Sequence, residues 1–141
     1  MNTTYDEIFE SFLLNCGYIS SEIPQNEIIQ KKMIEQGVKK YNSLANKYKD
    51  RLQGDLSYDS EKEEVNKKLE SLDLEVLANI IAWKFAKYKL DEFTSVWSVV
   101  ANQMGIKDYK NQLLARKETI KMYEDNFMSL ITDSITSFNL E

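Results

Sequence analysis

The most apolar stretch of the chain, residues 74–93, has the periodicity of a helix. One side carries Leu74, Leu77, Ile81 and Tyr88, and most of the rest is filled by Val76, Ile80, Trp83 and Phe85. A helix that is apolar nearly all round is buried by neighbours on several sides. Charges at Glu75, Lys84, Lys87 and Lys89 interrupt the run, which is therefore too polar to span a membrane. We predict that this segment is the central core helix and that Trp83 is a core residue.

Two amphipathic helices are predicted before it. Thr4-x-x-Glu7 has the form of a capping box, and the helix that follows should end before Gly17. Pro24 suits the first turn of a second helix. The apolar positions of this second helix alternate at spacings of four and three residues: Ile34, Val38, Tyr41, Ala45 and Tyr48. Gly37 inside this helix suggests close packing against a neighbour.

The stretch 53–60, QGDLSYDS, breaks the helical pattern and is predicted to be a loop or linker. Ser60-x-x-Glu63 again resembles a capping box, which predicts a short charged helix from Ser60 to about Ser71. Asp73 is placed to cap the central helix that follows.

The last third of the chain is predicted to be helical as well. Residues 93–103 are rich in β-branched side chains, but a single strand would have no partner, so helix is favoured. Gly105 should end that helix, and Asp108 should cap a final helix that reaches about Thr136. At about 1.5 Å per residue this helix would be on the order of 40 Å long. A helix of that length should project past the core or pack against something outside it.

These elements predict an all-α fold. With 141 residues, four glycines and one proline, the chain fits one helical domain over 1–141. We expect a bundle of about five helices with a central apolar helix and a long C-terminal helix. Residues 134–141 form a less charged tail, which is either a frayed end or an apolar hook that orders on a partner.

Charge is distributed in blocks around a net charge of −5. Residues 1–30 contain no Lys or Arg, 31–51 are strongly basic, 55–75 are acidic, and the last twenty residues carry acidic groups without a base. Such blocks are either solvated helix faces or complementary surfaces of neighbouring subunits. The negative balance disfavours general nucleic-acid binding.

The chain offers no recognisable catalytic chemistry. It has no histidine, a single Cys16 and no Gly-rich phosphate loop, so no catalytic, metal or cofactor site is predicted. Glu61, Glu63 and Glu64 stand among lysines and are interpreted as a solvated face. Without a catalytic, metal or cofactor site we expect a non-enzymatic protein. Because no secretory signal opens the sequence, we also expect it to be soluble and made in the cytoplasm.

Three regions are candidates for binding a partner. The first is the loop Asp55, Leu56, Ser57, Tyr58 and Asp59. The second is Trp97, which could equally belong to the core or to an interface because tryptophan is favoured in both. The third is the tail, whose apolar residues are Ile135, Phe138 and Leu140.

The order of these features resembles a family of small helical phage proteins. YDEIFESFL is followed by VKKYNSL, a DLSYD loop, the helix LEVLANIIAWKFAKYKL and the closing KDYKNQLLARKETIKMYEDNFMSLI. This pattern of residue types is similar to the head–tail connector, or head-completion, adaptors in the neck of tailed bacteriophages. The matching features are the 55–59 loop, Trp83 and Asp108-Tyr109-Lys110. The final helix departs from the family pattern because it remains helical to its end.

The resemblance implies a structural, non-enzymatic role in the virion neck. Such adaptors form a twelve-fold ring beneath the portal, bind the portal protein and tail-side neck proteins, and pass DNA through a central channel. It implies no cofactor and no membrane. Two other hypotheses stay open: a cytoplasmic helical module for protein–protein interaction or regulation, and a nucleic-acid binder that uses the lysines of 31–51.

Overall fold

The computed structural model describes residues 2–15 and 23–139, with the side chains of 96–104, 106 and 133–139 outside the description. The described chain contains four helices: α1 (Tyr5–Asn15), α2 (Glu27–Lys47), α3 (Ser71–Met104) and α4 (Ile106–Asn139). Three strands of two residues accompany them: β1 (Thr3–Thr4), β2 (Tyr58–Asp59) and β3 (Glu64–Val65). The all-α prediction is confirmed, with one helix fewer than expected.

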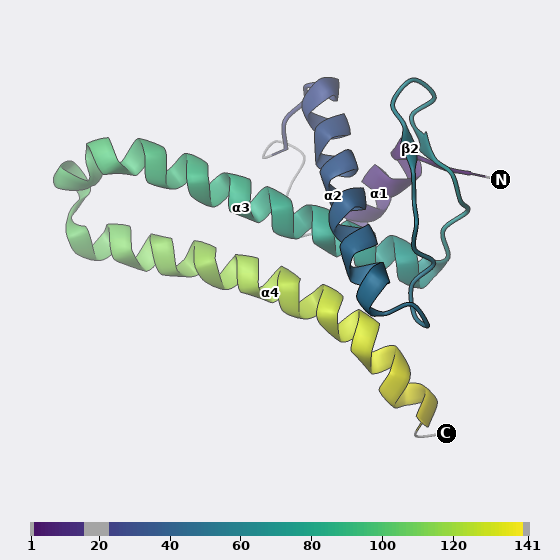
Figure 1. Ribbon diagram of the computed structural model, residues 1–141. Helices are drawn as coiled ribbons and strands as arrows, with labels where there is room; N and C mark the ends of the chain where they lie inside the picture. Colours follow the sequence, from purple (N-terminus) through teal and green to yellow (C-terminus); the bar gives the residue numbers. More distant parts are fainter. Residues whose placement is uncertain (1, 16–22, 140–141) are drawn as a thin grey trace.

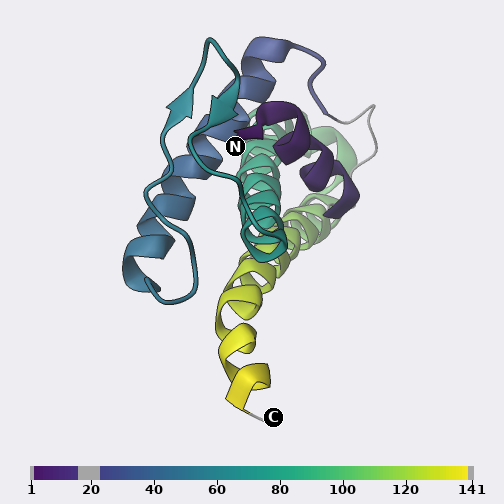
Figure 2. The same cartoon turned by 90° about the vertical axis from the view of Figure 1, so that its right-hand side faces the viewer.

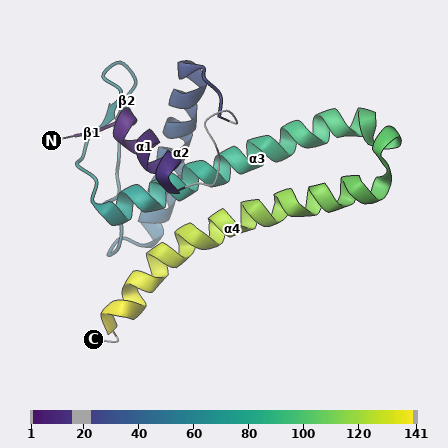
Figure 3. The same cartoon turned by 180° about the vertical axis from the view of Figure 1, so that it is seen from behind.

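The helices α3 and α4 form a long antiparallel hairpin that extends away from the rest of the molecule (Figure 1). Each helix has 34 residues, or about 50 Å at the usual rise. We call residues 87–119 the arm, because Phe93 is the only buried residue among the described side chains there. The head comprises the other described residues up to Ile131, and Figure 3 shows it gathered around the first half of α3.

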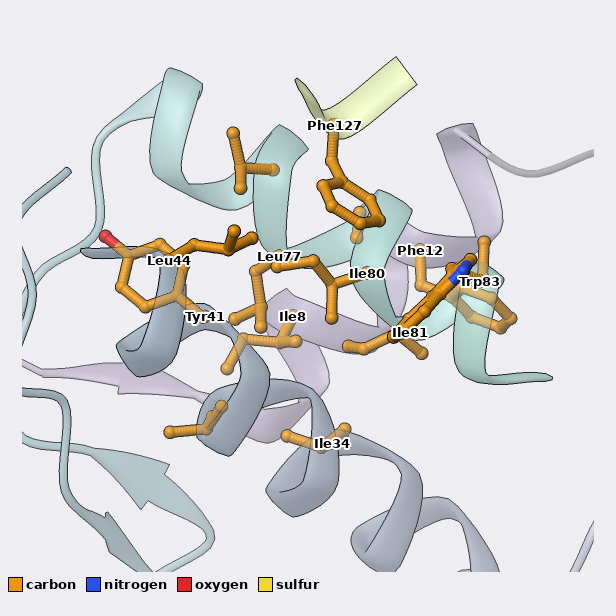
Figure 4. Close-up of a cluster of buried hydrophobic side chains, with 14 of the residues drawn as sticks. Ile8, Phe12, Ile34, Tyr41, Leu44, Leu77, Ile80, Ile81, Trp83 and Phe127 are labelled. Atoms are coloured by element: carbon orange, nitrogen blue, oxygen red, sulfur yellow. The ribbon is translucent and has the colours of Figure 1, made fainter. Parts of the chain in front are cut away.

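The core of the head is built around α3, as the apolar periodicity predicts. Residues 76–86 of α3 are almost all buried, and side chains from α1, α2 and α4 approach them from different sides (Figure 4). Phe12 of α1 meets the edge of Phe85 at a centroid distance of 6.3 Å. Phe127 of α4 meets Trp83 at 5.7 Å, and Trp83 is only 8% exposed. The prediction that Trp83 is a core residue is confirmed.

Tyr88 corrects the predicted burial of α3. It was expected on the buried side, but its side chain is 51% exposed. Tyr88 lies at the start of the arm, where it stacks on Phe85 at a centroid distance of 6.3 Å. The periodicity continues past the point at which α1 and α2 stop covering the helix, so the pattern alone overestimates burial there.

A small antiparallel sheet replaces the short charged helix predicted after Ser60. The strand order is β1-β3-β2, with Thr3 opposite Val65 and Tyr58 opposite Val65 on the other side. Asp59 Oδ1 accepts hydrogen bonds from the backbone N–H groups of Glu61 and Lys62, which closes a turn between β2 and β3. The turn and the complete burial of Val65 stabilise extended chain, so the predicted helix is wrong.

The stretch 53–60 is a loop, as predicted, and α2 holds it in place. The side chain of Asn42 donates to the carbonyl of Leu56 at 2.8 Å and accepts from the N–H of Leu56 at 2.9 Å. These two hydrogen bonds satisfy the backbone C=O and N–H groups of Leu56, which lies outside the strands.

Several helix boundaries differ from the predicted ones. α2 begins at Glu27 with Asn26 as its N-cap, two residues beyond Pro24. α3 begins at Ser71, so Asp73 lies inside its first turn instead of capping it. α4 begins at Ile106 immediately after Gly105, so Asp108 is a first-turn residue. At α1 the sequence prediction is confirmed, since Glu7 N–H donates to Thr4 Oγ1 at 3.2 Å.

Residues 93–103 are helical, as favoured, but they continue α3 without a break. The antiparallel neighbour α4 gives this β-branched segment a helical packing partner. The long final helix is also confirmed, and it runs to Asn139, beyond the predicted end near Thr136. Both halves of the hairpin therefore exceed the length that the pattern predicts.

Candidate interaction surface

The described residues contain no grouping of metal ligands. No set of three or more His, Cys, Asp or Glu side chains is arranged there to hold an ion. Within the same residues, no helix is long and apolar enough to cross a bilayer.

A groove runs between the first half of α2 and the middle of α3. It has a volume of about 230 Å³ and is lined by Pro24, Ile29, Lys32, Met33, Gln36, Lys84, Phe85 and Tyr88. Ile29 is 39% exposed and Tyr88 is 51% exposed, so apolar surface remains open to solvent. An apolar floor with polar edges is typical of a binding groove.

Three lysines surround the ring of Trp83, and one of them, Lys84, also lines this groove. The Nζ atom of Lys87 lies 3.7 Å from the Trp83 ring centroid, and those of Lys40 and Lys84 lie at 5.3 and 5.5 Å. These contacts are within the range of cation–π interactions. Lys40 comes from α2, whereas Lys84 and Lys87 follow Trp83 on α3, so the crossing of the two helices creates the cluster. The indole N–H of Trp83 is buried without a hydrogen-bond partner among the described residues.

We call this surface the lysine groove. It comprises Lys32, Lys40, Lys84 and Lys87, together with Ile29, Met33, Trp83, Phe85 and Tyr88. None of its four ammonium groups lies within 4.0 Å of a carboxylate in the described part of the chain. The lysine groove is therefore a local grouping of positive charge in a protein with a net charge of −5.

Two charged residues of α2, Lys31 and Glu35, have partners in other elements. Lys31 lies 2.7 Å from Glu63, and this hydrogen bond raises the pKa of the Lys31 ammonium. Glu35 accepts hydrogen bonds from the hydroxyl groups of Tyr5 and Ser60. Within the basic block of 31–51, Lys31 therefore pairs with the sheet region, whereas Lys32 and Lys40 belong to the groove.

The predicted 55–59 interface loop is only partly available. Asp55, Ser57, Tyr58 and Asp59 are exposed, and Tyr58 reaches 37%. Leu56 is 4% exposed and belongs to the hydrophobic core, so its assignment as an interface residue is corrected. The two hydrogen bonds between the Asn42 side chain and the backbone of Leu56 hold Leu56 against α2.

The remaining predicted interface residues lie elsewhere. Trp97 belongs to α3 within the arm, and Ile135 and Phe138 belong to the last turns of α4, with side chains outside the described set. Leu140 is outside the described residues altogether. The loop, the arm and the end of α4 occupy different parts of the molecule, so they do not form one site (Figure 1).

The lysine groove was not predicted from the sequence. Ile29, Met33, Gln36 and Lys40 recur at helical spacing along one flank of α2, and that pattern is a weak indication of a shared face. The decisive feature is the approach of Lys84 and Lys87 from α3, which depends on how the helices cross.

Comparison with known proteins gives the family. Residues 1–136 match the family described as YomZ prophage protein. The chain belongs to this family. It is also 30% identical over 136 residues to the SPbeta prophage-derived uncharacterized protein YomZ of Bacillus subtilis strain 168. That alignment covers 96% of this chain and 98% of the relative.

These matches identify a phage-derived protein and confirm the phage part of the sequence-based resemblance. No solved structure matches the chain significantly.

Proposed function

We propose that this protein is a structural adaptor in the neck of a tailed phage. It would form a ring between the portal protein and tail-side neck proteins, with DNA passing through the central channel. The observation that carries the proposal is the head-and-arm shape in a member of a phage family (Figures 1 and 3). This shape provides separate surfaces for separate neighbours.

The arm supports a role in contact with other proteins. Only Phe93 is buried among its described side chains, and Tyr88 and Leu114 are more than half exposed. The arm is nevertheless ordered internally, because Phe93 stacks on Tyr109 at 5.6 Å and Arg116 lies 4.5 Å above the Phe93 ring. A helical hairpin with so few buried residues among its described side chains is suited to packing against a neighbour.

Segregated charge supports assembly into a ring. The lysine groove lies on one flank of α2. Exposed carboxylates lie on α1, at Asp6 and Glu10, and at the first residue of α2, Glu27. A contact between two different surfaces of identical subunits is heterologous, and it closes into a ring when the rotation permits. The net charge of −5 would also keep a channel wall from holding the DNA phosphates.

The direct test combines the purified protein with the portal protein of the phage that encodes it. Native mass spectrometry and negative-stain electron microscopy should then detect a ring of twelve copies on a portal ring. The protein should also be present in purified particles and absent from capsids that lack a neck. A persistent dimer that ignores the portal would contradict the adaptor role, whereas a monomer that assembles only on the portal would agree with it.

The alternative is a cytoplasmic module for protein–protein interaction or regulation. The arm, with a single buried residue among its described side chains, favours it as well, since two such helical hairpins can pair into a four-helix bundle. Light scattering coupled to size-exclusion chromatography separates the two. A dimer at all concentrations, together with absence from purified particles, would favour the regulatory module.

A further inference from the structure

We propose that the lysine groove binds the C-terminal segment, residues 133–141, of a second copy of this chain. The proposal specifies the contact between neighbouring subunits and rests on the proposed ring for its biological setting.

The groove combines an apolar floor with unbalanced positive charge. Phe85, Met33 and Ile29 supply the floor, and the four lysines stand at its edges and around Trp83. Four described lysines have carboxylate neighbours within 4.0 Å, and none of the four lines the groove: Lys31, Lys68, Lys89 and Lys121. A ligand for the groove should therefore contribute apolar side chains to cover the floor and carboxylates to pair with the lysines.

The C-terminal segment has this composition. Residues 133–141, DSITSFNLE, contain Ile135, Phe138 and Leu140 as apolar residues and Asp133 and Glu141 as carboxylates. The segment contains no Lys or Arg, and neither do the eleven residues before it, 122–132. The segment therefore offers three large apolar side chains and two acids without a base.

The direction of α4 requires a partner copy. Phe127 contacts Trp83, and α4 then continues to Asn139, which is about 18 Å further along the helix. Figures 1 and 2 show this end of α4 leading away from the first half of α2, where the groove begins. A segment that moves away from its own groove can reach the same groove of a neighbour.

This contact joins two different surfaces, so each copy gives its segment to one neighbour and receives a segment from another. Repetition of the same contact produces a ring or an open filament. The lysines should make association sensitive to salt, because charge complementarity across an interface is screened by ions.

Charge reversal tests the contact in the full-length protein. Lys84→Glu combined with Lys87→Glu should weaken self-association about tenfold or more, measured by sedimentation velocity with and without portal. Asp133→Lys should weaken it in the same way. A mixture of the two variants should recover assembly, because each altered surface then meets a complementary one and the copies alternate around the ring.

The matched control is Lys47→Glu combined with Lys49→Glu, which makes the same change in net charge on exposed lysines at and just after the end of α2, outside both the groove and the arm. It should assemble like the unaltered protein. If the groove variant does not fold by circular dichroism, a chain ending at Thr132 gives an independent test. That chain retains Ile131, the last buried residue among those described, and should fold without self-associating.

Several outcomes would overturn the inference. Unchanged association of Asp133→Lys, no recovery in the mixture, or equal loss in the control variant would each do so. Loss of portal binding with intact self-association would assign the groove to the portal instead. If the variants form rings on the portal like the unaltered protein, the inference fails and the adaptor function stands. If self-association depends on the groove but no portal binds, the function fails and the inference stands.

Discussion

Gly37 of α2 lies so close to Ile81 of α3 that a Cβ atom added to Gly37 would be 2.7 Å from Ile81 Cγ1. Ile81 is completely buried at the centre of the head, so its side chain has no free space to move into. The absence of a side chain at Gly37 therefore allows α2 to approach α3 at this crossing. The sequence-based expectation that Gly37 marks close packing is confirmed.

Replacing Gly37 with Ala should destabilise the protein. The added methyl group overpacks the crossing, at a cost of about 1–3 kcal/mol, while the better helix propensity of Ala returns about 1 kcal/mol. We expect a net loss of about 1 kcal/mol in the free energy of unfolding by urea. Asn46→Ala, at an exposed position of the same helix, should be neutral or slightly stabilising.

A double-mutant cycle identifies the cause. Ile81→Ala removes Cγ1, so Gly37→Ala should be less costly in that background than in the unaltered protein. Additive losses would show that the methyl group at position 37 does not meet Ile81.

Tyr41 and Asp73 form the buried polar link between α2 and α3. The Tyr41 hydroxyl donates to Asp73 Oδ1, and both accept from the backbone N–H of Gln53, at 3.1 and 3.2 Å. Tyr41→Phe should lower the free energy of unfolding by about 1–3 kcal/mol, because it leaves the carboxylate of Asp73 without a hydroxyl donor. Tyr88→Phe, at a half-exposed tyrosine, is the matched control and should change stability by less than about 0.5 kcal/mol. Equal effects of the two substitutions would contradict this role.

Stability should fall in alkaline solution because of two buried tyrosines. Burial, and then hydrogen bonding to Glu35 for Tyr5 and to Asp73 for Tyr41, raises the pKa of both phenols well above their usual value. The folded protein therefore holds these protons above pH 10, whereas the unfolded chain releases them. The stabilisation is fully present below about pH 10 and is lost as the pH rises further.

The expected slope is about 1.4 kcal/mol per pH unit for each tyrosine. Tyr5→Phe and Tyr41→Phe should each remove one such contribution from urea unfolding measured between pH 8 and pH 11. The pKa of Lys31 is also raised, but that residue is common to all variants and cancels in the comparison. A slope that is the same in all three proteins would contradict the assignment.

The sequence predicts the core helices well because their apolar side chains repeat at helical spacing over many residues. Residues 74–86 are apolar on nearly every side, and only burial from several directions explains that composition. The seam of α2, including Ile34, Val38 and Tyr41, is buried as its spacing indicates. In these segments, local preference and tertiary packing favour the same structure.

The sheet could not be predicted, since each strand has only two residues and shows no periodicity. The charged stretch after Ser60 has the composition of a solvated helix. It is held extended by distant contacts: the N–H of Tyr5 donates to the carbonyl of Glu63, and Thr3 Oγ1 accepts from the N–H of Leu69. Glu63 also has a φ of 55°, which a helix does not allow.

The lysine groove is hidden in the sequence for a related reason. Lys40 and Lys87 are separated by 46 residues along the chain, yet both lie beside the Trp83 ring. Block-wise charge counts show that 31–51 are basic but do not show which lysines find carboxylates. Only the packing of α2 between the sheet and α3 brings Lys31 to Glu63 and Lys40 to Trp83.

The turn at the tip of the arm yields the last prediction. Gly105 joins α3 to α4 with a φ of 91° and a ψ of 139°, a conformation that side-chain-bearing residues rarely adopt. No atom lies within 4 Å of the position of an added Cβ, so the cost of a substitution comes from the backbone alone. Gly105→Ala should therefore strain the turn by about 1–3 kcal/mol without disturbing the head. Hydrogen exchange followed by mass spectrometry should show faster exchange in the arm, residues 87–119, and unchanged protection in 76–86. Equal acceleration in both regions would mean that arm and head unfold as one unit, so the arm would not be a separately opening part of the fold.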